Sequence, residues 1–159
     1  MSDASRKSSK DAVPAYDPYN VFAQIIQGKI ACHKVYEDDE SIVFMDLLPQ
    51  SPGHVQVVPK APSRNLMDAD PAVLAKILPL IQRVAIAAQA AFSADGVSIA
   101  QLNEQASGQT IYHLHFHVIP RFEGVELKTR ANRSMEDEAV LAANAEKLKA
   151  AMAGVLRSL

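Results

Sequence analysis

Three histidines alternate with apolar residues in the run His113-Leu114-His115-Phe116-His117-Val118-Ile119. Side chains on a β-strand point to opposite faces in turn, so this run predicts a strand with three imidazoles on one face and an apolar opposite face. We expect the strand to span residues 111–119 and to end at Pro120. Such a strand needs a sheet and a core to cover its apolar face, and this requirement strongly restricts the fold.

The remaining patterns indicate an α+β fold with a mainly antiparallel, five-stranded sheet. Strand-like runs at 34–36, 41–47, 54–58 and 97–102 supply the other four strands. Asp17-Pro18 and Asp70-Pro71 each predict the start of a helix, the second of which is long and apolar.

A third helix is predicted near the C-terminus. Ser134-Met135-Glu136-Asp137 has the pattern of a capping box, with aspartate in place of the usual glutamate. The apolar positions that follow step by four and three, so they form one stripe on the helix: Leu141, Ala145, Leu148, Met152, Val155 and Leu159. We expect this stripe to pack on the chain's own domain.

Composition excludes several classes of protein. The 159 residues fit one domain, and a net charge of −2 argues against a general nucleic-acid binder. The single cysteine, Cys32, excludes an internal disulfide framework. No apolar run of about 18 residues and no secretory signal are present, so we expect a cytoplasmic protein without a membrane span. The polar residues 1–13 are expected to form a disordered tail.

The histidine row admits three interpretations. A purely structural row would need a hydrogen-bond partner for each buried imidazole. A metal site would need another ligand, since the outer histidines are about 13 Å apart at roughly 3.3 Å per residue; His33, His54 and Asp46 are available. The interpretation that we favour is metal-free nucleophilic catalysis at phosphorus. Neighbouring imidazoles disfavour one another's protonation, so the central His115 is the expected nucleophile.

Three other positions are candidate site residues. The turn Gly108-Gln109-Thr110 precedes the row, and its backbone N–H groups and side chains can bind an anion or a leaving group. His54 follows Pro52-Gly53 at the start of a predicted strand. Asp46 lies at a strand end, where a carboxylate binds a ribose diol or caps a turn.

Together these residues resemble the histidine triad family, whose signature His-φ-His-φ-His-φ-φ (φ apolar) is matched at every position of 113–119. The resemblance extends from about Tyr19 to Arg121 and is closest to the Hint-like branch, in its bacterial form. It implies a HIT-like fold and a homodimer whose two sheets join into one ten-stranded sheet. It also implies hydrolysis at the α-phosphate of purine nucleoside phosphoramidates or related conjugates, which releases a nucleoside monophosphate.

The resemblance further implies a role for each site residue. His115 is the nucleophile, His117 and His54 orient it or contact phosphate, and His113 and Thr110 lie beside the phosphate and the leaving group. Asp46 bonds the ribose hydroxyls. The other implied nucleotide-binding residues are Phe22, Ile25, Phe44 and Leu47 around the base, with Asn103, Gly108 and Gln109.

The sequence departs from the family pattern at two places. Many members carry a Cys-x-x-Cys zinc pair where this chain has Asn20-Val21-Phe22-Ala23, so we expect no structural zinc and no cofactor. Many members also place a binding-site asparagine at the position of Leu102, whereas here the asparagine is Asn103. We expect the family's domain to span 14–124 and to be followed by an extension, 125–159, that contains the last helix.

Three alternative functions remain open from the sequence. One is a dinucleoside polyphosphate hydrolase of the fragile-histidine-triad type, because Gln109 and the ending Val118-Ile119-Pro120-Arg121 also suit that branch. Another is a nucleotide-dependent regulatory module with vestigial hydrolysis. The third is a zinc or iron hydrolase.

Overall fold

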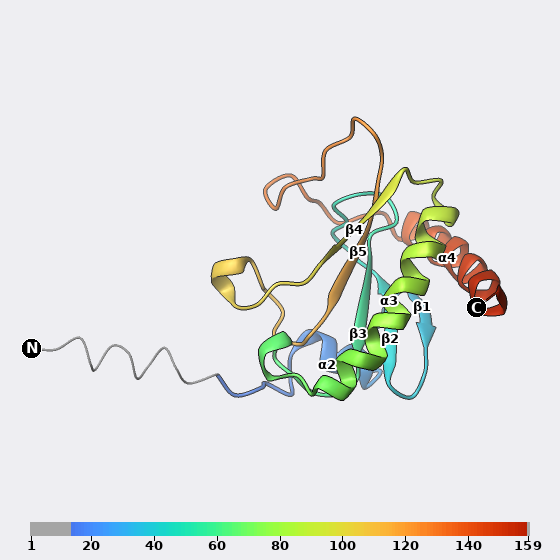
Figure 1. The fold of residues 1–159 in the computed structure, drawn as a ribbon. Helices are drawn as coiled ribbons and strands as arrows, with labels where there is room; N and C mark the ends of the chain where they lie inside the picture. Colours follow the sequence, from blue (N-terminus) through green and yellow to red (C-terminus); the bar gives the residue numbers. More distant parts are fainter. Residues whose placement is uncertain (1–13, 159) are drawn as a thin grey trace, which may run out of the picture.

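The computed structural model describes residues 14–158 and contains one five-stranded antiparallel sheet (Figure 1). The strands, in the spatial order β1-β2-β3-β5-β4, are β1 (Lys34–Glu37), β2 (Ser41–Met45), β3 (Val55–Pro59), β5 (Phe116–Arg121) and β4 (Gly96–Ala100). Every neighbouring pair is antiparallel, which confirms the predicted fold class. The expected disordered tail, 1–13, and Leu159 of the apolar stripe lie outside the described residues.

Two long helices cover one face of the sheet, and a short helix packs on the other. The long helices are α3 (Pro71–Ala91) and α4 (Glu138–Ser158), which lie beside each other in Figure 1. The short helix is α2 (Val21–Ile26). Single 3-10 turns at Leu66–Asp68 and Gln105–Ser107 complete the regular structure.

The alternation of side chains along β2 assigns its residues to two separate apolar clusters. Val43 and Met45 join the large core beneath α3 and α4. Ile42 and Phe44 join a smaller cluster with Phe22 of α2. Because both faces are covered by apolar groups, all five residues of the strand are buried.

Helix α4 is part of the main core. Its residues Leu141, Ala145, Leu148 and Met152 are buried against α3 and the sheet, as their predicted stripe requires. Helix α3 is long and apolar enough to cross a membrane by length and composition. Its buried residues, which include Ile77, Ile81 and Val84, pack in the same core, and this packing accounts for part of its apolar character.

Two predicted helix starts are wrong by three residues. The first helix begins at Val21, because the side chain of Asn20 accepts the Ala23 N–H, whereas Asp17 caps the preceding turn at Tyr19 N. At α4, Asp137 is the capping residue, since its carboxylate accepts the Ala139 N–H at 2.8 Å. By contrast, Asp70 caps α3 as predicted.

The histidine-bearing strand is shifted relative to the prediction. It begins at Phe116, because residues 111–115 leave the ladder and the Leu114 N–H donates instead to the oxygen of Ser63. It also continues through Pro120, which pairs with Val97 of β4. Position 120 of β5 is not paired with β3, so the lack of an N–H on proline costs the sheet no hydrogen bond there.

Candidate active site

Four neighbouring strands contribute side chains to the floor of a pocket, on the face of the sheet that α2 covers. Phe44 is opposite Gln56, Gln56 is opposite His117, and His117 is opposite Ala100. Cross-strand partners point to the same face, so these four side chains form one row across the sheet. All four line a pocket of about 450 Å³.

The lining of the pocket combines apolar and polar residues. The apolar lining includes the four residues expected around a base, Phe22, Ile25, Phe44 and Leu47. The polar lining includes Asp46, His115, His117 and the turn Gly108-Gln109-Thr110. A pocket that combines a large apolar surface with a few polar groups is typical of a small-molecule site.

His115 is positioned by a bond to the backbone of the first triad residue. Its Nδ1 donates to the oxygen of His113 at 2.6 Å, and its ring meets that of Phe22 edge to face, with centroids 4.8 Å apart. Because a carbonyl oxygen can only accept, the proton is on Nδ1 and the Nε2 lone pair is free. Burial lowers the pKa of His115 to about 4, so the ring is neutral at physiological pH.

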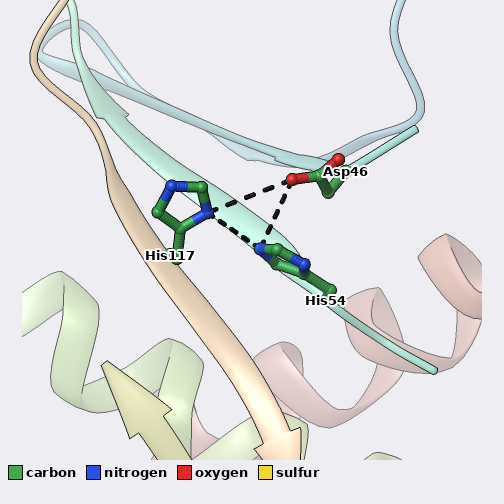
Figure 2. Close-up of side chains that lie close together, drawn as sticks. All are labelled: Asp46, His54 and His117. Carbon is green, nitrogen blue, oxygen red and sulfur yellow. Dashed lines mark hydrogen bonds and ion pairs between the residues drawn. The ribbon is translucent and has the colours of Figure 1, made fainter. Parts of the chain in front are cut away.

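Asp46, His54 and His117 form a cluster of polar side chains (Figure 2), and the centroids of the His117 and His115 rings are 5.1 Å apart. His54 Nε2 is 2.9 Å from His117 Nδ1 and 3.3 Å from an oxygen of Asp46. The same Asp46 oxygen accepts the Gln56 side-chain N–H at 2.7 Å. Burial lowers the pKa of both His54 and His117 to about 4, so both rings are neutral.

The hydrogen bonds also assign the protons of this pair. The backbone N–H of Gln50 donates to His54 Nδ1 at 3.0 Å, so the proton of His54 is on Nε2. The N–H at His54 Nε2 donates to His117 Nδ1, and therefore the proton of His117 is on Nε2. The pocket thus contains His115 with a free Nε2 lone pair and His117 with an Nε2–H donor.

His113 lies apart from His54, His115 and His117. Its ring is buried, with Nε2 donating to the oxygen of Pro59 at 2.7 Å and Nδ1 accepting from the hydroxyl of Tyr16 at 2.6 Å. It does not line the pocket. The expected row of three imidazoles on one strand face is therefore wrong: His113 and His115 precede β5, and two rings, not three, reach the pocket.

The turn before the triad is held by Gln109, whose side chain is buried. Its amide bonds the Asn65 side chain, the backbone N–H of Glu104 and the oxygens of Arg64 and Ile111. Gly108 has a φ of +103°, which suits a residue without Cβ. Asn103 bonds Gln101 and the Leu66 N–H, and Leu102, not Asn103, lines the pocket.

Asp46, His54 and His117 also have the composition of a metal site, with one ligand atom each within 4.8 Å of the others. The proton positions do not fit a bound cation. A metal at His54 Nε2 would require the proton on Nδ1, where it would face the N–H of Gln50. The hydrogen bonds of this cluster therefore suit a pair of neutral histidines better than a set of metal ligands.

Several pocket residues were not predicted from the sequence. Gln50 and Gln56 bond the histidine and aspartate cluster, and Arg130 and Arg133 line the pocket from the segment before α4. The strand register points to Gln56, since it is the cross-strand partner of His117. The two arginines are more than ten residues beyond the signature, and no local pattern marks them.

Comparison with known proteins identifies the family. The HIT domain model matches residues 27–124, more than half of the chain. The chain therefore belongs to the HIT family, and its complete histidine signature falls within the matched residues. The relatives as a group support the coarse class of a nucleotide-binding hydrolase.

Three similar proteins illustrate the match. The adenylylsulfatase HINT3 of Arabidopsis thaliana is 36% identical over 126 residues, which cover 77% of this chain and 64% of that protein. A HIT-like protein involved in cell-cycle regulation from Bartonella henselae, crystallised with an unknown ligand, is 49% identical with a TM-score of 0.81, covering 86% of this chain and 99% of that one. A zinc-bound histidine triad protein from Mycobacterium smegmatis is 32% identical with a TM-score of 0.79, covering 89% and 98%.

Proposed function

We propose that this protein hydrolyses purine nucleoside phosphoramidates or related nucleotidyl conjugates at the α-phosphate, through a covalent intermediate on His115. The observation that carries the proposal is the bond from His115 Nδ1 to the oxygen of His113. It leaves Nε2 as the nitrogen with the free lone pair, on a residue that lines the same pocket as His117 and the turn 108–110. A neutral, oriented imidazole is the form that attacks phosphorus.

The reaction divides into two displacements at phosphorus. In the first, His115 Nε2 forms a bond to the α-phosphorus and the bond to the leaving amine breaks, with a proton from solvent passing to the amine nitrogen. In the second, water attacks, the bond to His115 breaks, a nucleoside monophosphate is released, and the proton lost by the attacking water goes to solvent. His117 Nε2–H donates to a non-bridging phosphate oxygen in both steps, and the Thr110 hydroxyl contacts the leaving group.

The apolar residues of the pocket lining support the binding of a nucleoside. Phe22, Ile25, Phe44 and Leu47 offer the flat, apolar walls that a purine requires. Asp46 has two oxygens, each already accepting one N–H, and a carboxylate retains further acceptor capacity for ribose hydroxyls. We also propose a homodimer and a cytoplasmic location. Size-exclusion chromatography with light scattering tests the first, and cell fractionation tests the second.

The decisive experiment is turnover of adenosine phosphoramidate by His115→Ala. We expect loss of turnover with retained binding of adenosine monophosphate, and a matched His33→Gln control with the wild-type rate, since His33 bonds Glu138 outside the pocket. Mass spectrometry of a His117 variant mixed with substrate should detect one added nucleoside monophosphate. Unchanged turnover in His115→Ala would contradict the mechanism and leave the regulatory module as the better explanation.

Two further assays separate the remaining alternatives. A diadenosine polyphosphate turned over much faster than the phosphoramidate would favour the fragile-histidine-triad type. Turnover that is lost on adding a chelator and restored by zinc or iron would favour a metal hydrolase. We expect neither result, because the proposed reaction uses only side chains of this chain.

A further inference from the structure

Gln56 bridges an aspartate and a histidine that line the pocket with it. Its Nε2 lies 2.7 Å from an oxygen of Asp46 and 3.2 Å from His117 Nδ1. Gln56 is the cross-strand partner of His117, and only 4% of its surface is exposed. Because Nε2 carries two hydrogens, one amide group can donate to both neighbours at once.

The orientation of the Gln56 amide is fixed by these two acceptors. Turning the amide over would place Oε1 against a carboxylate oxygen of Asp46, and two acceptors repel each other. In the observed orientation Oε1 is buried and has no hydrogen-bond partner among residues 14–158. A buried acceptor without a partner destabilises a fold, whereas an apolar side chain of the same length carries no such cost. The advantage of a glutamine at this position therefore lies in its two N–H groups.

His54 has one N–H for two acceptors. Since Gln50 donates to its Nδ1, the proton is on Nε2, which lies 2.9 Å from His117 Nδ1 and 3.3 Å from an Asp46 oxygen (Figure 2). A carboxylate is the stronger acceptor of the two. The Asp46 oxygen that competes for this N–H is the same oxygen that accepts from Gln56. Gln56 therefore reduces the competition, and the His54 N–H goes to His117.

The outcome of this competition decides which nitrogen of His117 carries the proton. With Nδ1 accepting, the proton is on Nε2, the nitrogen that donates to phosphate in the proposed mechanism. Without a donor to Nδ1, the Asp46 oxygen 4.0 Å away would favour a proton on Nδ1. Nε2 would then present a lone pair to a phosphate oxygen, and the interaction would be repulsive.

We propose that Gln56 is a positioning residue that keeps the proton of His117 on Nε2. It does so by occupying the Asp46 oxygen, which would otherwise take the N–H of His54. The use of this proton rests on the proposed function, in which His117 Nε2–H donates to a non-bridging phosphate oxygen. The location of the proton does not, because hydrogen bonds within the chain determine it.

The direct test is ¹⁵N NMR of the His117 ring in histidine-labelled protein at about pH 7.5. Protonated and unprotonated ring nitrogens give separate signals, and couplings to the ring hydrogens distinguish Nδ1 from Nε2. The signals of His117 are those lost in His117→Gln. We expect the proton on Nε2 in the wild type and mainly on Nδ1 in Gln56→Met. A wild-type proton on Nδ1, or an unchanged ring in Gln56→Met, would overturn the proposal.

A second substitution should reverse the effect of the first. The amide of Asp46→Asn is a weaker acceptor than a carboxylate, so in the double variant with Gln56→Met the His54 N–H is again free for His117. We expect the proton of His117 to return to Nε2. A proton that stays on Nδ1 in the double variant would reject the competition with Asp46.

Gln24→Met is the control for the substitution itself. The Gln24 side chain donates to the oxygen of Tyr19 at 2.7 Å and does not line the pocket. This variant also loses one side-chain hydrogen bond, but it should leave the protonation of His117 and the turnover at wild-type values. A change in the His117 ring in this control would show that the NMR readout is not specific to Gln56, and would reject the proposal.

Turnover of adenosine phosphoramidate separates a positioning role from a merely structural one. We expect Gln56→Met to lower kcat about tenfold, the effect of one hydrogen bond, with KM changed by less than about twofold. Its free energy of unfolding should equal or exceed that of the wild type, because the unpartnered Oε1 is removed. A lower kcat with the proton of His117 still on Nε2 would assign the loss to packing and overturn the proposal.

The two measurements distinguish failure of this inference from failure of the proposed function. A wild-type protein that hydrolyses no phosphoramidate would refute the proposed function, and the NMR comparison would still decide the role of Gln56. If Gln56→Met does not fold, Gln56→Leu removes the same two donors and carries the same comparison.

Discussion

His54 Nε2 donates a hydrogen bond to His117 Nδ1 over 2.9 Å, from the residue that precedes β3 to the second residue of β5. The direction of this bond is set by the Gln50 N–H on the far side of the His54 ring. It leaves the Nε2–H of His117 available to a phosphate in the pocket. His54 contacts no reacting atom in the proposed mechanism, yet it determines which ring nitrogen of His117 carries the proton.

Replacing His54 tests this arrangement through a matched pair of variants. His54→Asn retains an acceptor for Gln50 N–H but loses the donor to His117, so we expect kcat to fall about tenfold with little change in KM. The effect is limited because the Gln56 side chain also donates to His117 Nδ1, at 3.2 Å. His54→Gln places an N–H donor near the position of Nε2 and should recover most of the rate. Equal rates in the two variants would remove the positioning role.

Stability should decrease on acidification between about pH 6.5 and 4. The pKa of His54, His115 and His117 is lowered from 6.5 to about 4 by burial, so the unfolded chain binds more protons than the folded one within that window. The stabilising difference is complete above pH 6.5 and is lost as the pH falls toward 4. One such group contributes on the order of 3 kcal/mol at most, at 1.36 kcal/mol per pKa unit.

Urea denaturation at pH 7.5, 6, 5 and 4.5 measures this dependence. His54→Asn removes one of the three groups and should give a shallower decline than the wild type. The pKa of Glu37 is lowered in the fold by its bonds to Lys34 and Lys60, and that of Asp38 by its hydrogen bonds, so neither carboxylate opposes the histidine effect in the upper part of this window. A free energy of unfolding that stays constant from pH 7.5 to 4.5 would show that the three rings are not neutral in the fold.

Leu148→Ala should destabilise the whole fold by about 2–5 kcal/mol, the usual cost of truncating a fully buried leucine. Leu148 is completely buried in the core shared by α4, α3 and the sheet. Val140 lies on the same helix with 41% of its surface exposed, so Val140→Ala is the control and should change stability by less than about 1 kcal/mol. Two separate transitions in Leu148→Ala would indicate that α4 unfolds independently of the sheet.

Gly53→Ala should cost roughly 2 kcal/mol or more. Gly53 has a φ of +85°, and a Cβ atom there would lie 2.5 Å from the Phe92 ring. Gly96→Ala is the matched control, because Gly96 has an ordinary φ and nothing within 4 Å of the added atom. Thermal unfolding compares the two variants. Because Gly53 precedes His54, we also expect lower turnover in Gly53→Ala, and an unaffected melting temperature would contradict the strain.

The sequence predicted the elements of the fold well because its strongest signals are local. Asp70 before Pro71 and the apolar stripe of α4 act within a few residues, and both are confirmed. The start of β5 was misplaced because alternation continues through residues 111–115 after they leave the ladder. Whether a backbone N–H such as that of Leu114 bonds a strand or the oxygen of Ser63 is decided by distant residues.

The candidate site was also predictable where its pattern is local and not where it depends on distant residues. The histidines and the turn 108–110 form a continuous pattern, so their neighbourhood was predictable. The contacts of His113 with Tyr16 and Pro59 depend on residues 97 and 54 positions away. Arg130 and Arg133 reach the pocket only because their segment bonds the β2–β3 connection. No periodicity or motif encodes such long-range contacts.

The backbone N–H groups of Lys128 and Glu136 donate to Gln50 and Leu47 in the pocket wall, so the hydrogen exchange of these two amides depends on whether a ligand occupies the pocket. Their amide hydrogens exchange with deuterium when that wall opens, either locally or with the whole fold. A nucleotide that bridges the wall and the histidines makes such openings rarer. Slower deuterium uptake at Lys128 and Glu136 would then report binding from a stretch of chain that the family's own domain does not include.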